Sequence, residues 1–242
     1  MPARPGRYAL TVPRAMTAEG RAGKTRMLLR CGVWAGPAFT AVFLAEGSVR
    51  EDYRPLRHPV SSLALGPRGW IQAANFVVAG AAFLAAAAGL RLAGDRVAGD
   101  HAMSGGTGPA LVAAAGTGLI MAAAFPTDPV RGYPPGTPDV LTEPSRAGIV
   151  HNLAAVPVFF GLPAAAVAYG WRSWRSGERP GFAALCAATA VTMPVAMGLA
   201  AAGFSGSARL AGYGGLFQRA SIIAGFGWLT AVSARALRRT PR

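Results

Sequence analysis

The sequence predicts an all-α integral membrane protein, a bundle of six transmembrane helices with both termini in the cytoplasm. The first observation behind this prediction is composition. Of the 242 residues, 52% are apolar and only 14% are charged, whereas about a quarter of the residues in a soluble domain are charged. The low charge excludes a disordered chain, and two cysteines are too few for a disulfide-stapled scaffold. The other two observations are long runs without charge and an uneven distribution of basic residues.

Six apolar segments each come close to the roughly 20 residues that cross a hydrocarbon core about 30 Å thick. In order along the chain, we expect transmembrane spans over residues 28–45, 70–90, 107–126, 148–171, 181–202 and 216–236. Four stretches contain no Asp, Glu, Lys or Arg, namely 70–90, 104–127, 147–171 and 181–208. Inside a soluble protein, runs of this length would be buried helices with no surface left to face water.

Basic residues divide unevenly between the two sides that these spans define. The N-terminal arm, the second and fourth loops and the C-terminal tail hold 16 Lys/Arg and 4 Asp/Glu, whereas the first, third and fifth loops hold 8 and 6. The sides therefore carry +12 and +2. Because cytoplasmic loops are the ones enriched in Lys and Arg, both termini are expected in the cytoplasm. Insertion and anionic head groups explain the basic excess, so we expect membrane lipids as partners and no nucleic acid.

The expected membrane domain covers residues 27–236 and has a basic segment on each side. Residues 1–26 are predicted to be a disordered cytoplasmic arm, and residues 237–242 a short cytoplasmic tail. No small-x-small cleavage site follows the first apolar run, which favours an uncleaved signal anchor in the cell membrane. Met16 and Met27 are alternative translation starts.

Small residues and prolines within the spans predict how the helices pack. Stripes of small residues let helix backbones approach closely, and a proline inside a helix removes a hydrogen bond and can kink it. The stripes are Ala81, Ala85 and Gly89 in the second span and Ala114, Gly118 and Ala122 in the third. The prolines inside spans are Pro37, Pro157, Pro163 and Pro194. We therefore expect a tight bundle with local kinks.

Residues able to do chemistry gather where spans meet the outer side. The first outer loop contains RHPVSSLALG (57–66), the third outer loop begins FPTDP (125–129), the start of the fourth span reads SRAGIVHN (145–152), and the last span begins GLFQR (215–219). We expect one outward-facing polar pocket lined by His58, Ser61, Ser62, Asp128, His151, Gln218 and Arg219.

In combination, these four stretches resemble the six-span prokaryotic membrane family known as domain of unknown function 998 (DUF998). In that family a His-Pro-x-Ser-Ser-Leu-Ala-Leu-Gly segment precedes a Gly-Trp span start, here Gly69-Trp70. A Phe-Pro-x-Asp-Pro turn follows the third span, a His opens the fourth, and Phe-Gln-Arg opens the sixth. The resemblance covers roughly residues 28–236 and implies the six-span fold, but no activity. A fainter similarity links the chain to eukaryotic six-span proteins tied to lipid remodelling.

Arg219 is the charged residue whose position the sequence constrains most closely. The uncharged stretch that follows it, 220–234, has 15 residues, which is about 22 Å of helix. Because this is shorter than the core of about 30 Å, Arg219 is expected at or just inside the outer boundary. It either snorkels to the interface or turns inward to pair with Asp128 or an anionic ligand.

Two histidines and two carboxylates on the outer side could form a metal site. His58, Asp128 and His151 share this side with Glu143, and imidazole and carboxylate groups are common metal ligands. No HxxxH or HExxH spacing supports such a site, so we predict no metal and no cofactor. Otherwise, Asp128 makes an Asp-Pro turn and His151 is a hydrogen-bonded residue at a helix start.

The two serines of the first outer loop have two readings. Ser61 or Ser62 is either a nucleophile beside one of the histidines or a cap for the helical turn that begins at Leu63. Because no catalytic motif with tight spacing is present, we expect a protein that binds or moves a lipid or small anion through the outward-facing pocket. The alternative is an intramembrane hydrolase or lipid-remodelling enzyme that uses a His/Asp/Ser group, with or without a metal.

Overall fold

The chain folds as a bundle of long helices. The computed structural model describes residues 18–94, 106–177 and 180–241, and within these ranges every regular element is a helix. The long helices are α1 (Ala18–Val49), α2 (Gly69–Gly94), α3 (Thr107–Ala124), α4 (Arg146–Val156), α5 (Leu162–Arg175), α6 (Pro180–Phe204) and α7 (Gly214–Arg239). Two short elements complete the described part, a 3-10 helix η1 (Val60–Ala64) and a π-helical turn η2 (Pro157–Gly161).

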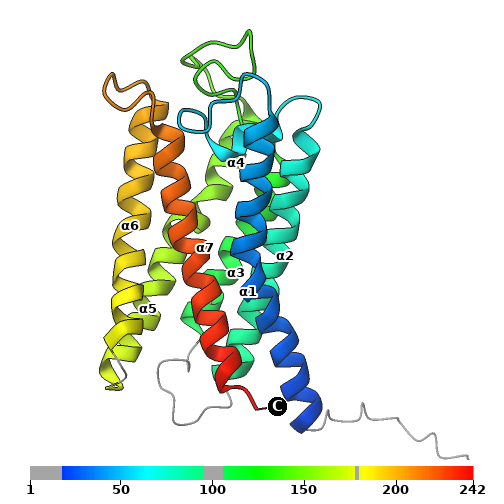
Figure 1. Ribbon diagram of the computed structural model, residues 1–242, viewed down its shortest axis with the longest axis vertical. Coiled ribbons are helices and arrows are strands. Elements are labelled where there is room, and N and C mark those ends of the chain that lie inside the picture. Colours follow the sequence, from blue (N-terminus) through cyan, green and yellow to red (C-terminus); the bar gives the residue numbers. More distant parts are fainter. Residues whose placement is uncertain (1–17, 95–105, 178–179, 242) are drawn as a thin grey trace, which may run out of the picture.

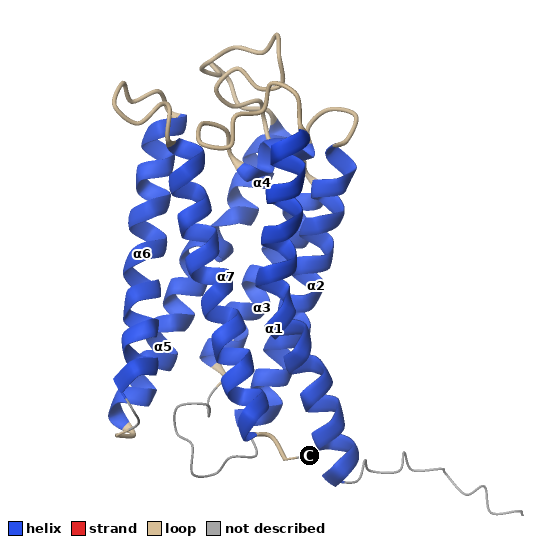
Figure 2. Cartoon of the chain, viewed as in Figure 1, coloured by secondary structure: helices blue, strands red, loops and turns tan. Residues whose placement is uncertain are grey.

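Six segments of this bundle are long and apolar enough to cross a membrane, which confirms the predicted six-span, all-α fold over the described residues. α4, η2 and α5 follow one another without a break and make up the fourth of these segments, Arg146–Arg175. Figure 1 shows the loops 50–68, 125–145 and 205–213 together at one end of the bundle, which we call the loop end. α1 begins and α7 finishes at the opposite, terminal end (Figures 1 and 2).

Each span extends beyond the expected boundaries in at least one direction, except the third, which finishes at Ala124. The largest difference is in α1, which begins at Ala18 rather than Leu28. Residues 18–26, expected in a disordered arm, are therefore helical, and residues 1–17 lie outside the described residues. Arg26 explains part of this extension, because its Nη1 donates to the carbonyl oxygens of Leu237 and Thr240 at the end of α7.

The backbones of α2 and α3 approach each other closely at two glycines, on a face next to the predicted stripes. A Cβ on Gly80 would lie 2.6 Å from the carbonyl oxygen of Gly116, and a Cβ on Gly116 would lie 2.8 Å from that of Gly80. Neither residue belongs to the stripes read from the sequence, in which Ala81 and Ala114 are exposed. Backbone contact through small residues is thus present as expected. The contacting glycine is one position from the predicted stripe in α2 and two positions from it in α3.

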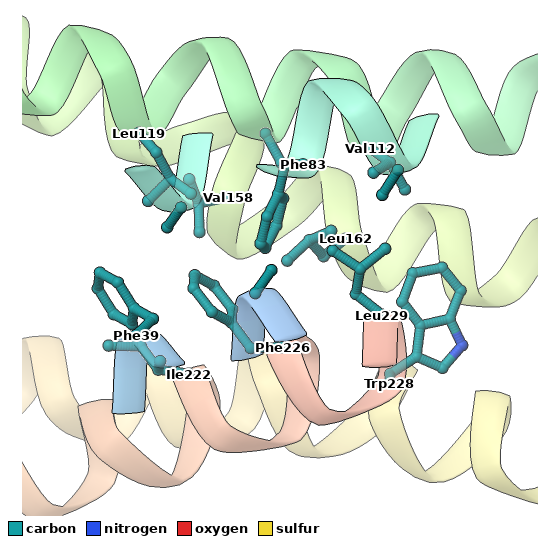
Figure 3. Close-up of a cluster of buried hydrophobic side chains, with 14 of the residues drawn as sticks. Phe39, Phe83, Val112, Leu119, Val158, Leu162, Ile222, Phe226, Trp228 and Leu229 are labelled. Carbon is teal, nitrogen blue, oxygen red and sulfur yellow. The ribbon is translucent and has the colours of Figure 1, made fainter. Parts of the chain in front are cut away.

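The core is a cluster of aromatic and aliphatic side chains where α1 and α7 face α2, α3 and α5. Figure 3 shows Phe39, Ile222 and Phe226 pointing toward Leu119, Val158 and Phe83. Phe226 is the central ring, with centroids 4.9 Å from Phe39 and 4.7 Å from Phe83. Burying aromatic rings of this size supplies much of the packing energy of a helical bundle. This cluster also forms the inner wall of the site described below.

Pro157 interrupts the fourth span, as the sequence predicts. It lacks the N–H that an α-helix needs at this position, and the next residues form a π-helical turn up to Gly161. The loop-end part of the span, α4, packs on α3, and the part beyond the turn, α5, packs on both α3 and α6. Turns of this kind are frequent at functional sites, and this one divides the span at the level of a cavity.

Candidate functional site

A cavity of about 270 Å³ lies at the loop end, between η1 and the core cluster. Aromatic and aliphatic side chains from α1, α2, α3, α4, η2, α6 and α7 make up most of its walls. Five polar side chains also line it: Ser61, Thr127, His151, Asn152 and Gln218. None of the described residues lining the cavity is Asp, Glu, Lys or Arg, so the cavity is an apolar chamber with a neutral polar end.

One side of the cavity opens through the side of the bundle. Asn152, Val156 and Phe160 line the cavity and are also exposed on α4 and η2, with Phe160 59% exposed. Half-buried Met197 and Phe204 of α6 form the facing wall. A residue that lines a cavity and is also exposed marks its rim. The opening therefore lies between the fourth span and α6, on a surface that a membrane-spanning bundle presents to lipid.

His151 is held in one tautomer with its second nitrogen unpaired. Its Nδ1 lies 3.1 Å from the carbonyl oxygen of Ala122 and 2.8 Å from that of Phe125, at the end of α3. Carbonyl oxygens only accept hydrogen bonds, so Nδ1 carries the proton and Nε2 of the neutral ring is an acceptor. The side chain is only 5% exposed and lines the cavity. Among the described residues, Nε2 has no hydrogen-bond partner.

The same reasoning establishes the orientation of the Gln218 amide. The backbone N–H of Val60 lies 2.7 Å from the Oε1 position of Gln218. A backbone N–H only donates, so the amide oxygen must occupy this position. The NH₂ group of Gln218 is then the free end of the side chain, which lines the cavity and is 7% exposed. Gln218 thus holds the start of η1 and offers hydrogen-bond donors to the cavity.

The two serines of η1 have different surroundings. Ser61 lines the cavity, whereas the Ser62 hydroxyl is fully buried without a hydrogen-bond partner among the described residues. The expectation that one of them caps a helix beginning at Leu63 is wrong. Both serines lie inside η1, whose N-cap residue is Pro59 and has no side-chain cap. No hydrogen bond joins Ser61 to either histidine within the described part of the chain.

Arg219 is buried, with 7% exposure, but it faces the first loop rather than the cavity. Its Nη1 donates to the carbonyl oxygens of Pro55, His58 and Gly215, and its Nη2 donates to the Tyr53 hydroxyl. Asp128 is not among its partners in the described residues, so the predicted ion pair is not formed. Burial raises the pKa of Tyr53, and the Arg219 charge opposes that rise. The Tyr53 hydroxyl in turn donates to the carbonyl oxygens of His58 and Pro59.

Asp128 lies at the start of α4 instead. Its Oδ2 accepts a hydrogen bond of 3.0 Å from the backbone N–H of Ser145, and Ser145 caps α4 by accepting from Gly148 N at 3.0 Å. A Cβ at position 148 would collide with the Asp128 carboxylate, which explains the glycine there. A negative charge at this helix N-terminus is favourable. Asp128 therefore joins the third loop to the fourth span and does not line the cavity.

His58 has the opposite tautomer to His151 and no free nitrogen. Its Nδ1 accepts from the backbone N–H of Arg54 at 3.0 Å, so its Nε2 carries the proton and faces the Arg131 carbonyl at 3.3 Å. Burial lowers the pKa of His58 to about 4, and the nearby charges of Arg57 and Arg54 act in the same direction. A second proton would have to sit on Nδ1, where it would face the Arg54 N–H instead of accepting from it. His58 is thus neutral and links the first outer loop to the third through backbone hydrogen bonds.

The four candidate metal ligands are dispersed over different elements of the loop end. Both nitrogens of His58 are used by backbone groups, Asp128 belongs to the start of α4, and Glu143 is exposed. Across the described ranges, no group of three or more His, Cys, Asp or Glu side chains is arranged to hold a metal ion. The sequence predicted these residues on one side of the membrane, but the fold does not bring them together.

Three residues at or near the site were not singled out from the sequence. Buried Glu46, in the last turn of α1, pairs with Arg50 at 3.1 Å and Arg68 at 2.5 Å. The four-residue spacing of Glu46 and Arg50 was an available signal. Asn152 and Thr127, which line the cavity, are the sequence neighbours of His151 and Asp128, two residues predicted for the pocket. A polar Asn in an uncharged run was a second signal.

Comparison with known proteins gives one match. None of the curated proteins and none of the solved structures compared with the chain matches it. The sequence model of the family described as "Protein of unknown function (DUF998)" matches residues 33–235. This range includes the second to fifth spans completely, the loop-end part of the first span and most of the last, and every described residue that lines the cavity. Because the match covers most of its length, the chain belongs to the DUF998 family of multi-pass membrane proteins.

Proposed function

We propose that this protein binds an amphipathic lipid in the loop-end cavity and admits it sideways from the bilayer. The observation that carries the proposal is the cavity itself, an apolar chamber with a neutral polar end and a rim exposed between the fourth span and α6. Small-molecule sites in proteins are mostly apolar, with a few placed polar groups. At about 270 Å³, the cavity is just below the usual range of about 300–1,000 Å³. It suits one acyl chain rather than a whole two-chain lipid.

A lipid fits the lining better than a small anion does. Proteins hold anions with cationic side chains or with several converging N–H groups. The two terminal nitrogens of Arg219 bond to backbone carbonyls and Tyr53, and no cation of the described residues lines the cavity. An anion in this chamber would lose its hydration without gaining a counter-charge, which is costly. Of the two ligand classes expected from the sequence, the lipid is therefore the one proposed.

The side from which lipid enters follows from the charge distribution. The loop end carries the less basic loops, so the positive-inside rule assigns it to the outer face of the cell membrane. The rim then opens toward the outer leaflet. The terminal end, with its excess of Lys and Arg, faces the cytoplasm and its anionic lipids.

A second candidate, an esterase, is favoured by the state of His151. With Nδ1–H held by two carbonyls, Nε2 is the acceptor that a general base requires, and Ser61 lines the same cavity. The Ser61 hydroxyl would attack an ester carbonyl of the bound lipid while His151 takes its proton. His151 would then give that proton to the departing alcohol, and water would release the acyl group in the same way. Ester cleavage abolished by Ser61→Ala would favour this candidate.

Native mass spectrometry in a mild non-ionic detergent tests lipid binding, with elemental analysis of the same sample for bound metal. Wild-type protein is expected to carry one lipid per chain. Ala155→Trp, which fills the cavity from α4, should lose it. Ala164→Trp is the matched control because Ala164 belongs to the same span but is exposed. No bound lipid on the wild type, or equal loss in both variants, would overturn the proposal.

A further inference from the structure

The polar end of the cavity presents one fixed acceptor and one fixed donor. In the neutral imidazole of His151, Nε2 accepts, because the other ring nitrogen carries the proton that faces two carbonyls. The free amide end of Gln218 must donate, because its oxygen is held by the Val60 N–H. Both side chains are more than nine-tenths buried, and both line the same cavity. While the ring is neutral, neither group can reverse its polarity without breaking a bond to the backbone.

Two buried groups of fixed and opposite polarity define what the ligand must offer. A buried donor or acceptor left without a partner costs free energy, so a ligand that pairs with only one of them is disfavoured. We propose that the bound lipid carries an uncharged group that donates to His151 and accepts from Gln218. A lipid hydroxyl, as in a long-chain alcohol or an acylglycerol, is the simplest such group. This inference rests on the proposed function and specifies its ligand.

Other common head groups fail one of the two requirements. An ether or a methyl ester only accepts, so it leaves the His151 acceptor facing another lone pair. An ionised carboxylate or phosphate also only accepts, and it brings a charge into a chamber without a lining cation. An ammonium group only donates and opposes the NH₂ group of Gln218. The pair therefore discriminates by hydrogen-bond polarity rather than by charge.

The test uses four probes with the same chain: lauryl alcohol, lauryl methyl ether, lauryl phosphate and n-dodecane. Their dissociation constants for wild-type protein are measured by native mass spectrometric titration. The alcohol should bind two- to tenfold more tightly than the ether, roughly the contribution of one hydrogen bond. The alkane should bind more weakly than the ether, and the phosphate should bind no better than the alkane.

One variant assigns the discrimination to His151. His151→Asn keeps an amide NH₂ near the Nδ1 position, where it can still donate to the carbonyl oxygens of Ala122 and Phe125, and it removes Nε2. It should bind the alcohol no better than the ether while its affinity for the ether is unchanged. Leu153→Ala, at an exposed position that does not line the cavity, is the control and should keep the wild-type order.

The outcomes separate this inference from the proposed function. Equal binding of alcohol and ether to wild-type protein, tighter binding of the phosphate, or a preference retained in His151→Asn would overturn the assignment of the head group. Failure of all four probes to bind would overturn lipid binding itself. If His151→Asn does not fold, the order of the four probes on wild-type protein still decides the assignment.

Discussion

Replacing Arg219 with Met removes the group that holds the first loop onto α7. The guanidinium makes four hydrogen bonds in a site that is 7% exposed, three to carbonyl oxygens and one to the Tyr53 hydroxyl. A hydrogen bond from a charged donor contributes about 1.5–3 kcal/mol in water-soluble proteins. Hydrogen bonds between membrane helices average about 0.6 kcal/mol. Between these limits, we expect Arg219→Met to lower the free energy of unfolding by about 3–5 kcal/mol.

A double-mutant cycle identifies the partner. Unfolding of the detergent-solubilised protein by SDS, followed by far-ultraviolet circular dichroism, gives the free energy for each variant. Arg219→Met and Tyr53→Phe share a hydrogen bond, so their effects should fall short of additivity by about 1 kcal/mol. Arg219→Met and Asp128→Asn should be additive within about 0.5 kcal/mol, because the two side chains have separate partners. Coupling to Asp128 with additivity toward Tyr53 would refute this reasoning.

In the same SDS titration, Gly215→Ala should lower stability by about 1–3 kcal/mol, because its Cβ would collide with the carbonyl oxygens of Pro55 and His58. Gly212→Ala, whose Cβ meets nothing within 4 Å, should leave stability unchanged, and equal effects would contradict the close approach. Because burial lowers the pKa of His58 from 6.5 to about 4, the unfolded chain binds a proton between these values that the folded chain excludes. Stability should therefore be full above about pH 6.5 and fall as the pH drops toward 4, and a wild-type pH dependence no steeper than that of His58→Gln would exclude this assignment. Glu46→Gln should cost about 1–3 kcal/mol by leaving buried Arg50 without its carboxylate, and a loss below about 0.5 kcal/mol would mean that the pair behaves as an exposed one.

The number and order of the spans could be predicted because each depends on a local property, a charge-free run of sufficient length. The α1 boundary could not, because its extra turns at the terminal end are held by Arg26 reaching the last carbonyls of α7. That contact joins residues more than 200 positions apart. Close packing through small residues was anticipated, but the face on which α2 meets α3 was not. A shift of one or two positions turns a helix face by about 100–200°, and composition does not resolve it.

For the candidate site, the sequence identified the right loops and three of the five polar cavity residues: Ser61, His151 and Gln218. The roles of the two histidines could not be told apart, because each depends on which backbone groups face the ring. The partner of Arg219 was missed for the same reason. Pairing with a carboxylate can be guessed from sequence, whereas pairing with main-chain carbonyls leaves no trace in residue types. The choice between Ser61 and Ser62 depended on a 3-10 helix that begins earlier than the expected turn.

The most direct test of lipid binding in the cavity is photolabelling in reconstituted membranes with a lauryl alcohol that carries a diazirine at the end of its chain. Peptide mapping by mass spectrometry should find the label on the walls of the cavity, within residues 152–160 of the fourth span and 197–204 of α6. Excess lauryl alcohol should suppress this labelling, and Ala155→Trp should abolish it while Ala164→Trp retains it. Labelling spread evenly over the exposed faces of all the helices, unaffected by competitor or by Ala155→Trp, would show that the cavity holds no lipid.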